Sequence, residues 1–239
     1  MTFYGIGTGP GDPELLTLKA ARILRSVQRI FYVAGPSTRE SLSRVIASAA
    51  GKEAEGKLRK LEFSMAHDMA DRRHSWQANA QAIAAELGAG ENCAFATIGD
   101  PMLYSTFVYI LPLVKELIPN LAVEVVPGIT SFQAAAAAGA FPLAMNDEIL
   151  SIIPAWHSDT LERPAAADAD TAVFLKTYRS RDAAVDFSAR HYKGDFLYAV
   201  KVGRPEERFC TNRALLKDLP EEYLSLIISK KRKANDGLD

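Results

Sequence analysis

GIGTGPGDPELLTLKA, at residues 5–20, decides the fold, because it joins an apolar run to a glycine-rich turn and an amphipathic segment. Residues 2–7 predict a buried strand, and residues 13–26 place apolar side chains at helical spacing. Asp12 can cap that helix, and Pro13 suits its first turn. Glycines between a strand and a helix let the backbone approach a ligand closely. The segment therefore predicts strand, turn and helix, and a ligand loop and a merely tight turn fit its glycines equally well.

The common nucleotide-binding patterns do not fit this loop. The pattern GxGxxG would need glycine where Pro10 or Asp12 stands, and GxxxxGK[ST] is absent from the turn. The loop therefore opposes a dinucleotide-dependent oxidoreductase, which is one of the function classes that an α/β chain of this size suggests.

The same arrangement returns at residues 97–107 (TIGDPMLYSTF), between a predicted strand at residues 92–98 and a predicted helix at residues 104–117. Gly99 permits close approach of a ligand, and Asp100 offers a carboxylate. Tyr104, Ser105 and Thr106 add hydroxyl groups at the helix start. A simpler explanation is an Asx-type turn followed by a helix cap. We also expect Pro112 to kink or interrupt the helix.

A third turn lies in VVPGITSFQAAAAAGAFPL, at residues 125–143. A strand ends at a Pro-Gly turn, and residues 130–138 predict a tightly packed helix of small side chains. Thr130 and Ser131 present hydroxyl and amide groups at its start, although a capped, buried helix would look the same. Ligands of open α/β sheets bind at the carboxyl ends of the strands. Three such turns in one half of the chain therefore predict one pocket at one sheet edge.

The second half of the chain has more strand per residue. Strands are expected at residues 149–153, 171–175, 196–202, 207–210 and 224–228. Earlier in the chain we expect helices at residues 38–49 and 67–87, a polar loop at residues 51–60, and a short strand at residues 61–63. The fold class is α/β, with two α/β domains at residues 1–145 and 146–239. The first has a mostly parallel sheet and the second a mixed sheet.

Composition excludes several partners. The 239 residues carry 28 basic and 29 acidic side chains and a net charge of -1, so we expect no nucleic-acid partner. The basic run at residues 230–233 is interpreted as a solvated tail. Cys93 and Cys210 are far apart and form no metal-binding spacing, so we expect no metal site and a reducing compartment. The sequence shows no signal peptide and no apolar stretch of membrane-spanning length, so we expect a cytoplasmic chain with no membrane partner.

The three turn segments resemble, in order and spacing, the signature blocks of the tetrapyrrole (corrin/porphyrin) methylase family. Within that family, YSTF after GDP and PGITSFQAAAA resemble the branch that methylates C-20 of precorrin-2. The resemblance implies a tetrapyrrole methylase fold with a cofactor cleft between the two domains. It also implies an S-adenosyl-L-methionine-dependent C-methyltransferase of vitamin B12 biosynthesis, which releases S-adenosyl-L-homocysteine. The substrate is expected to be precorrin-2 or cobalt-factor II, and the enzyme is expected to be a homodimer.

The resemblance also assigns cofactor contacts to positions of this sequence. They are Pro10 in the first loop, Gly99, Asp100, Leu103, Tyr104, Ser105 and Thr106 in the second, Thr130 and Ser131 in the third, and Lys176 and Gly203 in the second domain. Lys176 stands where relatives often have methionine, which is a departure from the family pattern.

Catalysis by such an enzyme can consist mainly of in-line positioning and exclusion of water, because a sulfonium is a strong electrophile. Asp100 is the candidate for a base that takes the C-20 proton, with cofactor or loop positioning as the alternative. The substrate carries many carboxylates, and basic side chains near strand ends of the second domain could face them or belong to a solvated surface. They are Lys176, Arg179, Arg181, Lys201 and Arg204. His157 is interpreted as a loop histidine.

Three alternatives remain open from the sequence. The chain could methylate a different ring carbon of a related tetrapyrrole, such as uroporphyrinogen III or a later precorrin. It could carry a tetrapyrrole without releasing S-adenosylhomocysteine, or it could be the oxidoreductase that the first loop already opposes.

Overall fold

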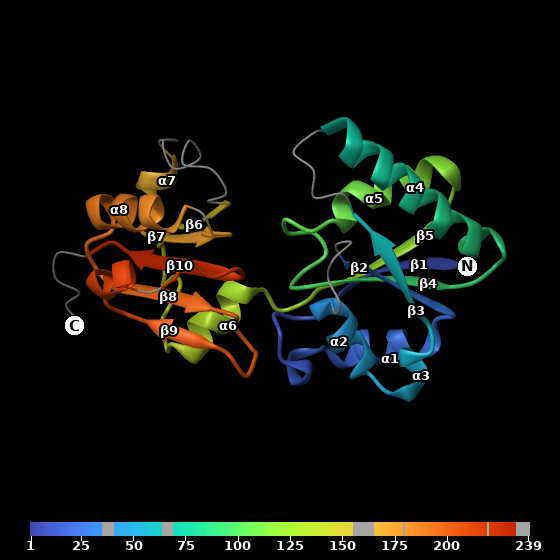
Figure 1. Cartoon of the computed structure of the whole chain (residues 1–239), viewed down its shortest axis with the longest axis horizontal. Coiled ribbons are helices and arrows are strands. Elements are labelled where there is room, and N and C mark those ends of the chain that lie inside the picture. The colour runs from blue at the N-terminus through green and yellow to red at the C-terminus, as the bar shows by residue number, and fades with distance from the viewer. Residues whose placement is uncertain (35–40, 64–68, 155–164, 179, 219, 233–239) are drawn as a thin grey trace. The chain divides into compact units, whose positions relative to one another are not determined.

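The computed structural model describes residues 1–34, 41–63, 69–154, 165–178, 180–218 and 220–232. The chain forms two compact units, Met1–Thr130 and Ser131–Asp239, and Figure 1 shows the elements of each. The predicted domain border at residues 145 and 146 lies further along the chain. Helix α6 (Ser131–Ala138) and the segment after it belong to the second unit, because α6 contacts strand β10 (Ser225–Lys230).

The first unit contains a five-stranded parallel sheet in the order β3-β2-β4-β1-β5. The strands are β1 (Thr2–Gly7), β2 (Arg29–Ala34), β3 (Leu58–Glu62), β4 (Cys93–Thr97) and β5 (Ala122–Val126). Strand β1 pairs with β4 on one side and with β5 on the other, so the carboxyl ends of these three strands lie side by side.

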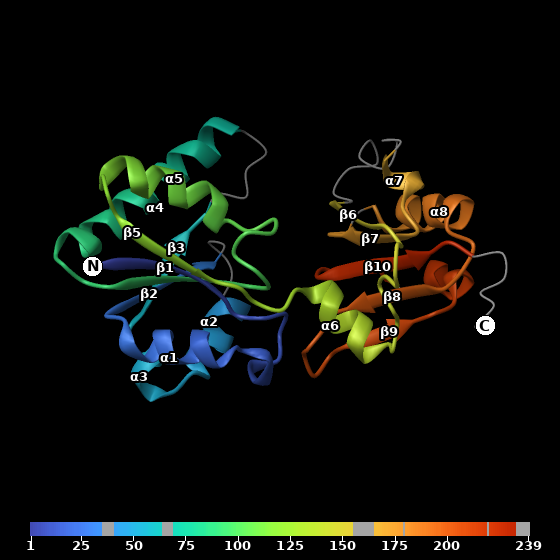
Figure 2. The same ribbon diagram turned by 180° about the vertical axis from the view of Figure 1, so that it is seen from behind.

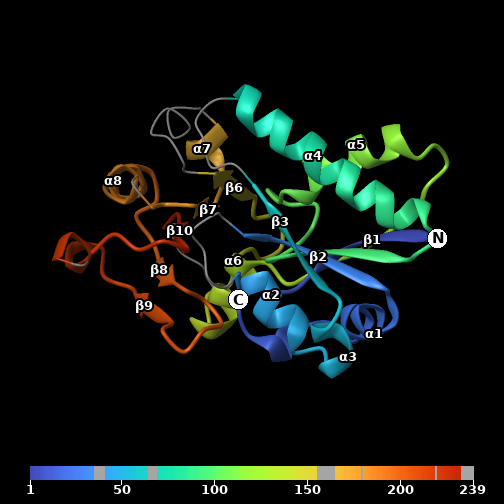
Figure 3. The ribbon, with the colours of Figure 1, turned by 45° about the vertical axis from the view of Figure 1, so that its right-hand side comes forward.

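Helices cover both faces of this sheet, as Figure 3 shows. On one face lie α4 (Met69–Gly88) and α5 (Phe107–Leu117), which pack with Phe3, Phe95 and Phe107 in one apolar cluster. On the other face lie α1 (Leu18–Ser26), α2 (Leu42–Ser48) and α3 (Lys52–Glu55). Cys93 is fully buried in the first cluster.

Three local predictions are corrected by the structure. The helix expected from residue 13 starts at Leu18, because Thr17 accepts from the Ala20 N–H and Pro13–Leu15 forms a separate 3₁₀ turn. Asp12 caps that turn through the Glu14 N–H. Residues 51–60 are not a loop but contain α3 and most of β3. Helix α5 starts at Phe107 rather than residue 104, and it continues through Pro112, where a kink stays a prediction.

The second unit contains a mixed five-stranded sheet in the order β6-β7-β10-β8-β9. The strands are β6 (Leu150–Pro154), β7 (Thr171–Leu175), β8 (Phe196–Val200), β9 (Arg208–Cys210) and β10. Only β6 and β7 pair in parallel, and the remaining neighbours are antiparallel. The prediction of a mostly parallel first sheet and a mixed second sheet is confirmed.

Figure 2 shows α7 (Ala165–Asp168) and α8 (Arg181–His191) on one face of this sheet and α6 on the other. Phe174, Phe187 and Tyr192 form the centre of the apolar cluster under α8. On the opposite face, a Cβ at Gly139 would approach the Leu197 side chain to 2.8 Å, which shows how closely the end of α6 packs on β8. A short 3₁₀ helix, η3 (Arg213–Asp218), connects β9 to the segment before β10.

Candidate functional site

The loops after β1, β4 and β5 lie at the switch point of the first sheet. After β1 the chain crosses to β2 beyond β4, and after β4 it crosses to β5 beyond β1. Connections therefore leave the neighbours β1 and β4 in opposite directions, which is where open α/β sheets bind ligands. The structure brings the three turns together within this unit, and the pocket expected among them stays a prediction.

Glycines let the three loops touch through their backbones. A Cβ at Gly128 would lie 2.1 Å from the Gly99 carbonyl oxygen and 2.7 Å from the Gly7 Cα. A Cβ at Gly7 would in turn meet the Gly128 nitrogen at 2.5 Å and the Gly99 oxygen at 2.6 Å. No side chain fits among these backbone atoms. Gly7 and Gly128 thus touch each other and the Gly99 carbonyl oxygen in a contact that leaves no room for a Cβ on either of them.

The first two loops are also joined by backbone hydrogen bonds. The Thr8 N–H and hydroxyl both donate to the Thr97 carbonyl, at 2.9 and 3.0 Å. The Gly99 N–H donates to the Gly9 carbonyl at 2.8 Å. Pro10 follows directly and is buried. These bonds fix the glycine-rich loop against the GDP loop without using a charged group.

Asp100 ties the second loop to the third. Its Oδ2 accepts from the Gly128 N–H at 3.0 Å, and its Oδ1 accepts from the Met102 N–H at 2.8 Å. The second bond is the Asx-type turn that the sequence allowed. Since both oxygens already accept from backbone N–H groups, this geometry favours a positioning role. A role for Asp100 as proton acceptor stays a prediction.

The rest of the GDP loop presents both buried and exposed groups. Gly99 has φ 69°, and Tyr104 has φ 50° with a side chain that is 44% exposed. A non-glycine residue in the left-handed region stores strain, and such residues are common at functional sites. Ser105 is buried and accepts from the Phe107 N–H at 2.9 Å, so it starts α5. Thr106 is the N-cap residue but makes no side-chain cap bond, and Leu103 is half-buried.

The third loop ends at the border of the two units. Thr130 belongs to the first unit, and its Cα is the nearest described heavy atom, at 3.9 Å, to a Cβ built on Gly99. Ser131 begins α6 in the second unit. Space therefore remains beside the Gly99 Cα, although Gly7 and Gly128 are tightly enclosed.

Lys176 and Gly203 lie in the second unit, each after the carboxyl end of a strand. Lys176 follows β7 with φ 60°, and surrounding atoms desolvate its ammonium group and lower its pKa. Gly203 follows β8 with φ 75°, and its N–H donates to Glu207 Oε2 at 2.6 Å. Because the Gly203 N–H already donates to Glu207, a ligand at this turn would contact atoms other than this N–H.

Comparison with known proteins decides the family. The model of the tetrapyrrole (corrin/porphyrin) methylases matches residues 2–220. The chain belongs to this family. It is similar to a cobalt-precorrin-2 C(20)-methyltransferase of Salmonella typhimurium, with 35% identity over 73% of this chain and 72% of the relative. It is also similar to a precorrin-2 C(20)-methyltransferase of a Sinorhizobium species, with 29% identity over 94% of this chain and 93% of the relative.

A solved structure shows the same fold in this methylase family. A uroporphyrin-III C-methyl transferase of Thermus thermophilus, complexed with S-adenyl homocysteine, matches with a TM-score of 0.68 and 21% identity. The match covers 96% of this chain and 92% of that one. The predicted tetrapyrrole methylase fold is confirmed by this likeness.

The basic residues that the sequence suggested for substrate carboxylates have different partners in this methylase. Arg181 is buried and pairs with Asp182 at 3.0 Å, while Arg204 pairs with Glu206 at 3.5 Å. Lys201 pairs with Glu222 at 3.2 Å. Arg179 and His157 lie outside the described residues. Arg181 in particular is already engaged within the second unit.

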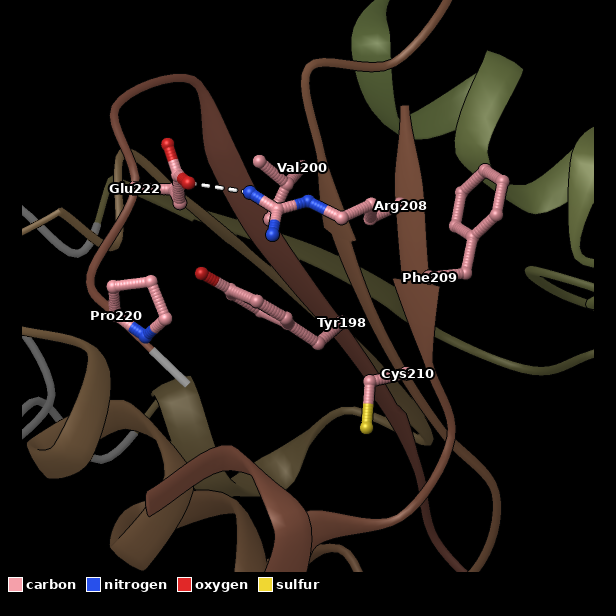
Figure 4. A pocket seen from close by; sticks show the side chains of 7 residues that line it. All are labelled: Tyr198, Val200, Arg208, Phe209, Cys210, Pro220 and Glu222. Atoms are coloured by element: carbon pink, nitrogen blue, oxygen red, sulfur yellow. Dashed lines mark hydrogen bonds and ion pairs between the residues drawn. The ribbon is translucent and has the colours of Figure 1, made fainter. Parts of the chain in front are cut away.

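A cavity of about 260 Å³ lies on the face of the second sheet that also carries α8. Tyr198, Val200, Arg208, Phe209, Cys210, Pro220 and Glu222 line it, as Figure 4 shows. The Arg208 guanidinium donates to Glu222. Burial raises the pKa of the Tyr198 hydroxyl, and nearby Ser225 and Arg181 partly offset this by favouring its charged form.

The described residues contain neither a metal-binding cluster nor a membrane-spanning helix. No group of three His, Cys, Asp or Glu side chains in this part of the chain is arranged to hold a metal ion. None of the described helices is both long enough and apolar enough to cross a membrane.

The sequence missed two groups that shape these loops. The sequence predicts Gly128 only as part of a Pro-Gly turn. Its contact with Gly7 and Gly99 forms when the three strand ends are adjacent, which no local pattern indicates. Glu222 lies in a polar segment with no motif, and its partners Lys201 and Arg208 are distant in sequence. The repeated placement of glycine directly after strands was a usable signal for the first group, whereas the second had none.

Proposed function

We propose that this chain transfers a methyl group from S-adenosyl-L-methionine to C-20 of precorrin-2 or its cobalt-containing equivalent, in cobalamin biosynthesis. The observation that carries the proposal is the convergence of the GDP loop, the first glycine-rich loop and the Pro-Gly loop at one switch point. Two relatives named for methylation of this carbon share 35% and 29% of their aligned residues with the chain.

The first unit fits a donor that is held largely by backbone groups. The Gly99 Cα has open space beside it, and the loops around it are already fixed to one another. A fixed loop loses little conformational entropy when a ligand binds, so the site is preorganised. The related Thermus methyltransferase was solved with S-adenyl homocysteine, which supports the same class of ligand here.

We assign donor binding to the positions that the family pattern gave. They are Pro10, Gly99, Asp100, Leu103, Tyr104, Ser105, Thr106, Thr130, Ser131, Lys176 and Gly203. Asp100 is assigned to loop positioning first, because its two oxygens join the GDP loop to Gly128 and Met102. Ser105 acts similarly by starting α5.

S-adenosylmethionine supplies an electrophilic methyl group on a sulfonium. The protein then has to hold the methyl carbon in line with the ring carbon and exclude water, which can account for a large part of the rate. The backbone contacts among the three loops serve this purpose, since rigid loops preserve the line of attack. The Tyr104 side chain belongs to the GDP loop and is 44% exposed, which supports a contact with the ring as part of this proposal.

Anaerobic incubation with S-adenosylmethionine and each ring form in turn tests the proposal. We expect one methyl group to be added, with stoichiometric release of S-adenosylhomocysteine, when precorrin-2 or cobalt-factor II is supplied. The product mass and the released nucleoside are the measurements.

The same incubation separates the alternatives. Ring binding without release of S-adenosylhomocysteine would identify a carrier, and the absence of NAD(P)H fluorescence quenching in a separate mixing experiment would exclude the oxidoreductase. Methylation of uroporphyrinogen III or a later precorrin, with none of precorrin-2, would retain the family and overturn the substrate.

We also propose a homodimer in the cytoplasm. The family resemblance supports the dimer, and the two free thiols Cys93 and Cys210 support a reducing compartment. Light scattering at micromolar concentration tests the first point, and a mass of one chain would contradict it. Fractionation of the source cells tests the second.

A further inference from the structure

The loop between β8 and β9, residues 201–207, has an unusual backbone. Lys201 has φ 51° and Gly203 has φ 75°, so two residues of this short connection are in the left-handed region. Inside the loop, the Arg204 N–H donates to the Lys201 carbonyl at 3.1 Å, and the Glu207 N–H donates to the Arg204 carbonyl at 2.9 Å. A lysine in this region is disfavoured relative to glycine, so the surrounding structure must hold it there.

One carboxylate holds both ends of this loop. Glu222 pairs with Lys201 Nζ at 3.2 Å, directly after β8, and accepts from the Arg208 guanidinium at the start of β9. The Glu222 side chain is 23% exposed and that of Lys201 is 27% exposed, whereas that of Arg208 is 54% exposed. The Lys201 N–H also donates to the Leu224 carbonyl at 2.9 Å, so the segment carrying Glu222 is joined to the loop by its backbone as well.

Apolar packing under this carboxylate is incomplete. The cavity of about 260 Å³ lies between Tyr198 and the Arg208–Glu222 pair, as Figure 4 shows. Side chains that line this pocket lack protein contacts on one side and gain less from packing. The conformation of the loop therefore depends on its polar ties more than on the packing below it.

We propose that Glu222 is a positioning residue for the methyl donor: through Lys201 and Arg208 it holds the 201–207 loop so that Gly203 can meet the adenosyl part of the donor. This inference rests on the proposed function, in which Gly203 contributes to donor binding. Glu222 acts through the loop and does not touch the donor itself.

Glu222→Gln tests the role, with Glu206→Gln as the matched control. Glu206 lies in the same loop and pairs with Arg204, but its side chain is 55% exposed and it spans neither end of the loop. Glu222→Gln weakens two partly exposed ion pairs, those with Lys201 and Arg208. If their combined free energy is lost from donor binding, the affinity for the donor falls about tenfold. We expect Glu222→Gln to weaken S-adenosylhomocysteine binding and raise KM for S-adenosylmethionine about tenfold, with kcat at saturating donor and KM for the ring retained. Glu206→Gln should bind like the original chain.

Arg208→Gln is a second variant that removes one tie and leaves Glu222 in place. Its exposed position makes it compatible with folding, and we expect about a threefold loss of S-adenosylhomocysteine affinity. Glu222→Asp keeps the charge and should restore part of the affinity that Glu222→Gln loses. Thermal unfolding of each variant shows whether the fold is retained.

Calorimetric binding of S-adenosylhomocysteine separates this inference from the proposed function. If the original chain binds no S-adenosylhomocysteine, the proposed function fails. If it binds but Glu222→Gln and Arg208→Gln bind equally well, the positioning role is overturned while the function stands. Equal losses in Glu222→Gln and Glu206→Gln, or a fall in kcat with KM unchanged, would also overturn it.

Discussion

The strand-end loops of the first unit and the β8–β9 loop of the second unit are fixed by different physics. In the first unit, Gly7, Gly99 and Gly128 bring backbones together, and Asp100 binds two backbone N–H groups. In the second unit, Glu222 holds the loop through two long cationic side chains. Close backbone contact tolerates almost no added volume, whereas ion pairs tolerate substitution but respond to salt and pH. The difference indicates a rigid platform in one unit and an adjustable loop in the other.

The largest loss of stability is expected from a side chain added to the backbone contact of the first unit. Gly128→Ala would place a Cβ 2.1 Å from the Gly99 oxygen, and we expect it to destabilise the protein by about 3 kcal/mol, at the upper end of typical overpacking costs. Urea unfolding measures this, and S-adenosylhomocysteine binding should be lost as well.

Gly56→Ala is the matched control for this substitution. At Gly56 an added Cβ would meet no described heavy atom within 4 Å, so we expect a change within about 0.5 kcal/mol. Equal losses of stability in Gly128→Ala and Gly56→Ala would show that the backbone contact of the three loops does not contribute to the stability of the protein.

The next effect concerns the tie between the GDP and Pro-Gly loops. Asp100→Ala removes both acceptors, and we expect at least about a tenfold loss of donor affinity or turnover, because hydrogen bonds to a charged group are strong. Titration calorimetry and steady-state kinetics are the measurements.

Asp100→Asn separates positioning from proton transfer. The amide keeps one acceptor, so a positioning role predicts a raised KM for S-adenosylmethionine with kcat largely retained. A loss of kcat of about a hundredfold with KM unchanged would instead identify Asp100 as the base. Unchanged affinity and rate in both variants would contradict either role.

High salt should have a smaller effect, and it should accelerate amide exchange in the β8–β9 loop but not in the strand-end loops of the first unit. The Debye length falls from about 10 Å at 0.1 M to about 3 Å at 1 M salt, so partly exposed ion pairs weaken. We expect amide exchange at Lys201 and Gly203 to accelerate about threefold in 1 M KCl. Exchange at Gly99 and Gly128 should not change, because neutral backbone contacts and a carboxylate–amide bond hold them. Equal acceleration in both loops would contradict the distinction.

The smallest effect is expected from pH. Lys201 and Arg208 hold the pKa of Glu222 below its usual value of 4.5, chiefly through their hydrogen bonds to its carboxylate. A depressed folded pKa contributes stability above the unfolded value, and this contribution is lost as pH falls through the folded value. The stability difference between the original chain and Glu222→Gln should therefore be constant well above the usual pKa of 4.5 and vanish only once pH falls below the depressed pKa of the folded protein. A difference that persists at low pH would show that it does not come from the carboxylate charge.

The first unit was largely predictable because its signals are local. A strand, a glycine turn and a helix follow one another at each of the three loops, and hydrophobic periodicity marks the strands. The predicted loop at residues 51–60 was wrong because the charged sequence there gives no strand pattern. Strand β3 forms by pairing with the edge of β2, and the buried Leu61 anchors it. The predicted start of α1 was wrong because two residues are suitable N-caps. Asp12 caps the 3₁₀ turn Pro13–Leu15, and Thr17 caps α1.

The candidate site was predictable in its residues but not in its contacts. The family pattern indicated Gly99 and Asp100, yet nothing local shows that Asp100 reaches Gly128, a residue of the next strand end. The role of Glu222 was hidden for the same reason, since residues 201, 208 and 222 meet only after three strands are paired. Such contacts depend on strand order, which a single sequence specifies weakly.

The position of the transferred methyl group tests the central claim most directly. S-adenosylmethionine labelled with ¹³C in the methyl group is incubated anaerobically with the protein and either precorrin-2 or cobalt-factor II, and the product is examined by ¹³C NMR. The account predicts a single labelled methyl group attached to C-20. Label at another ring carbon, or no labelled product despite measured donor binding, would contradict it.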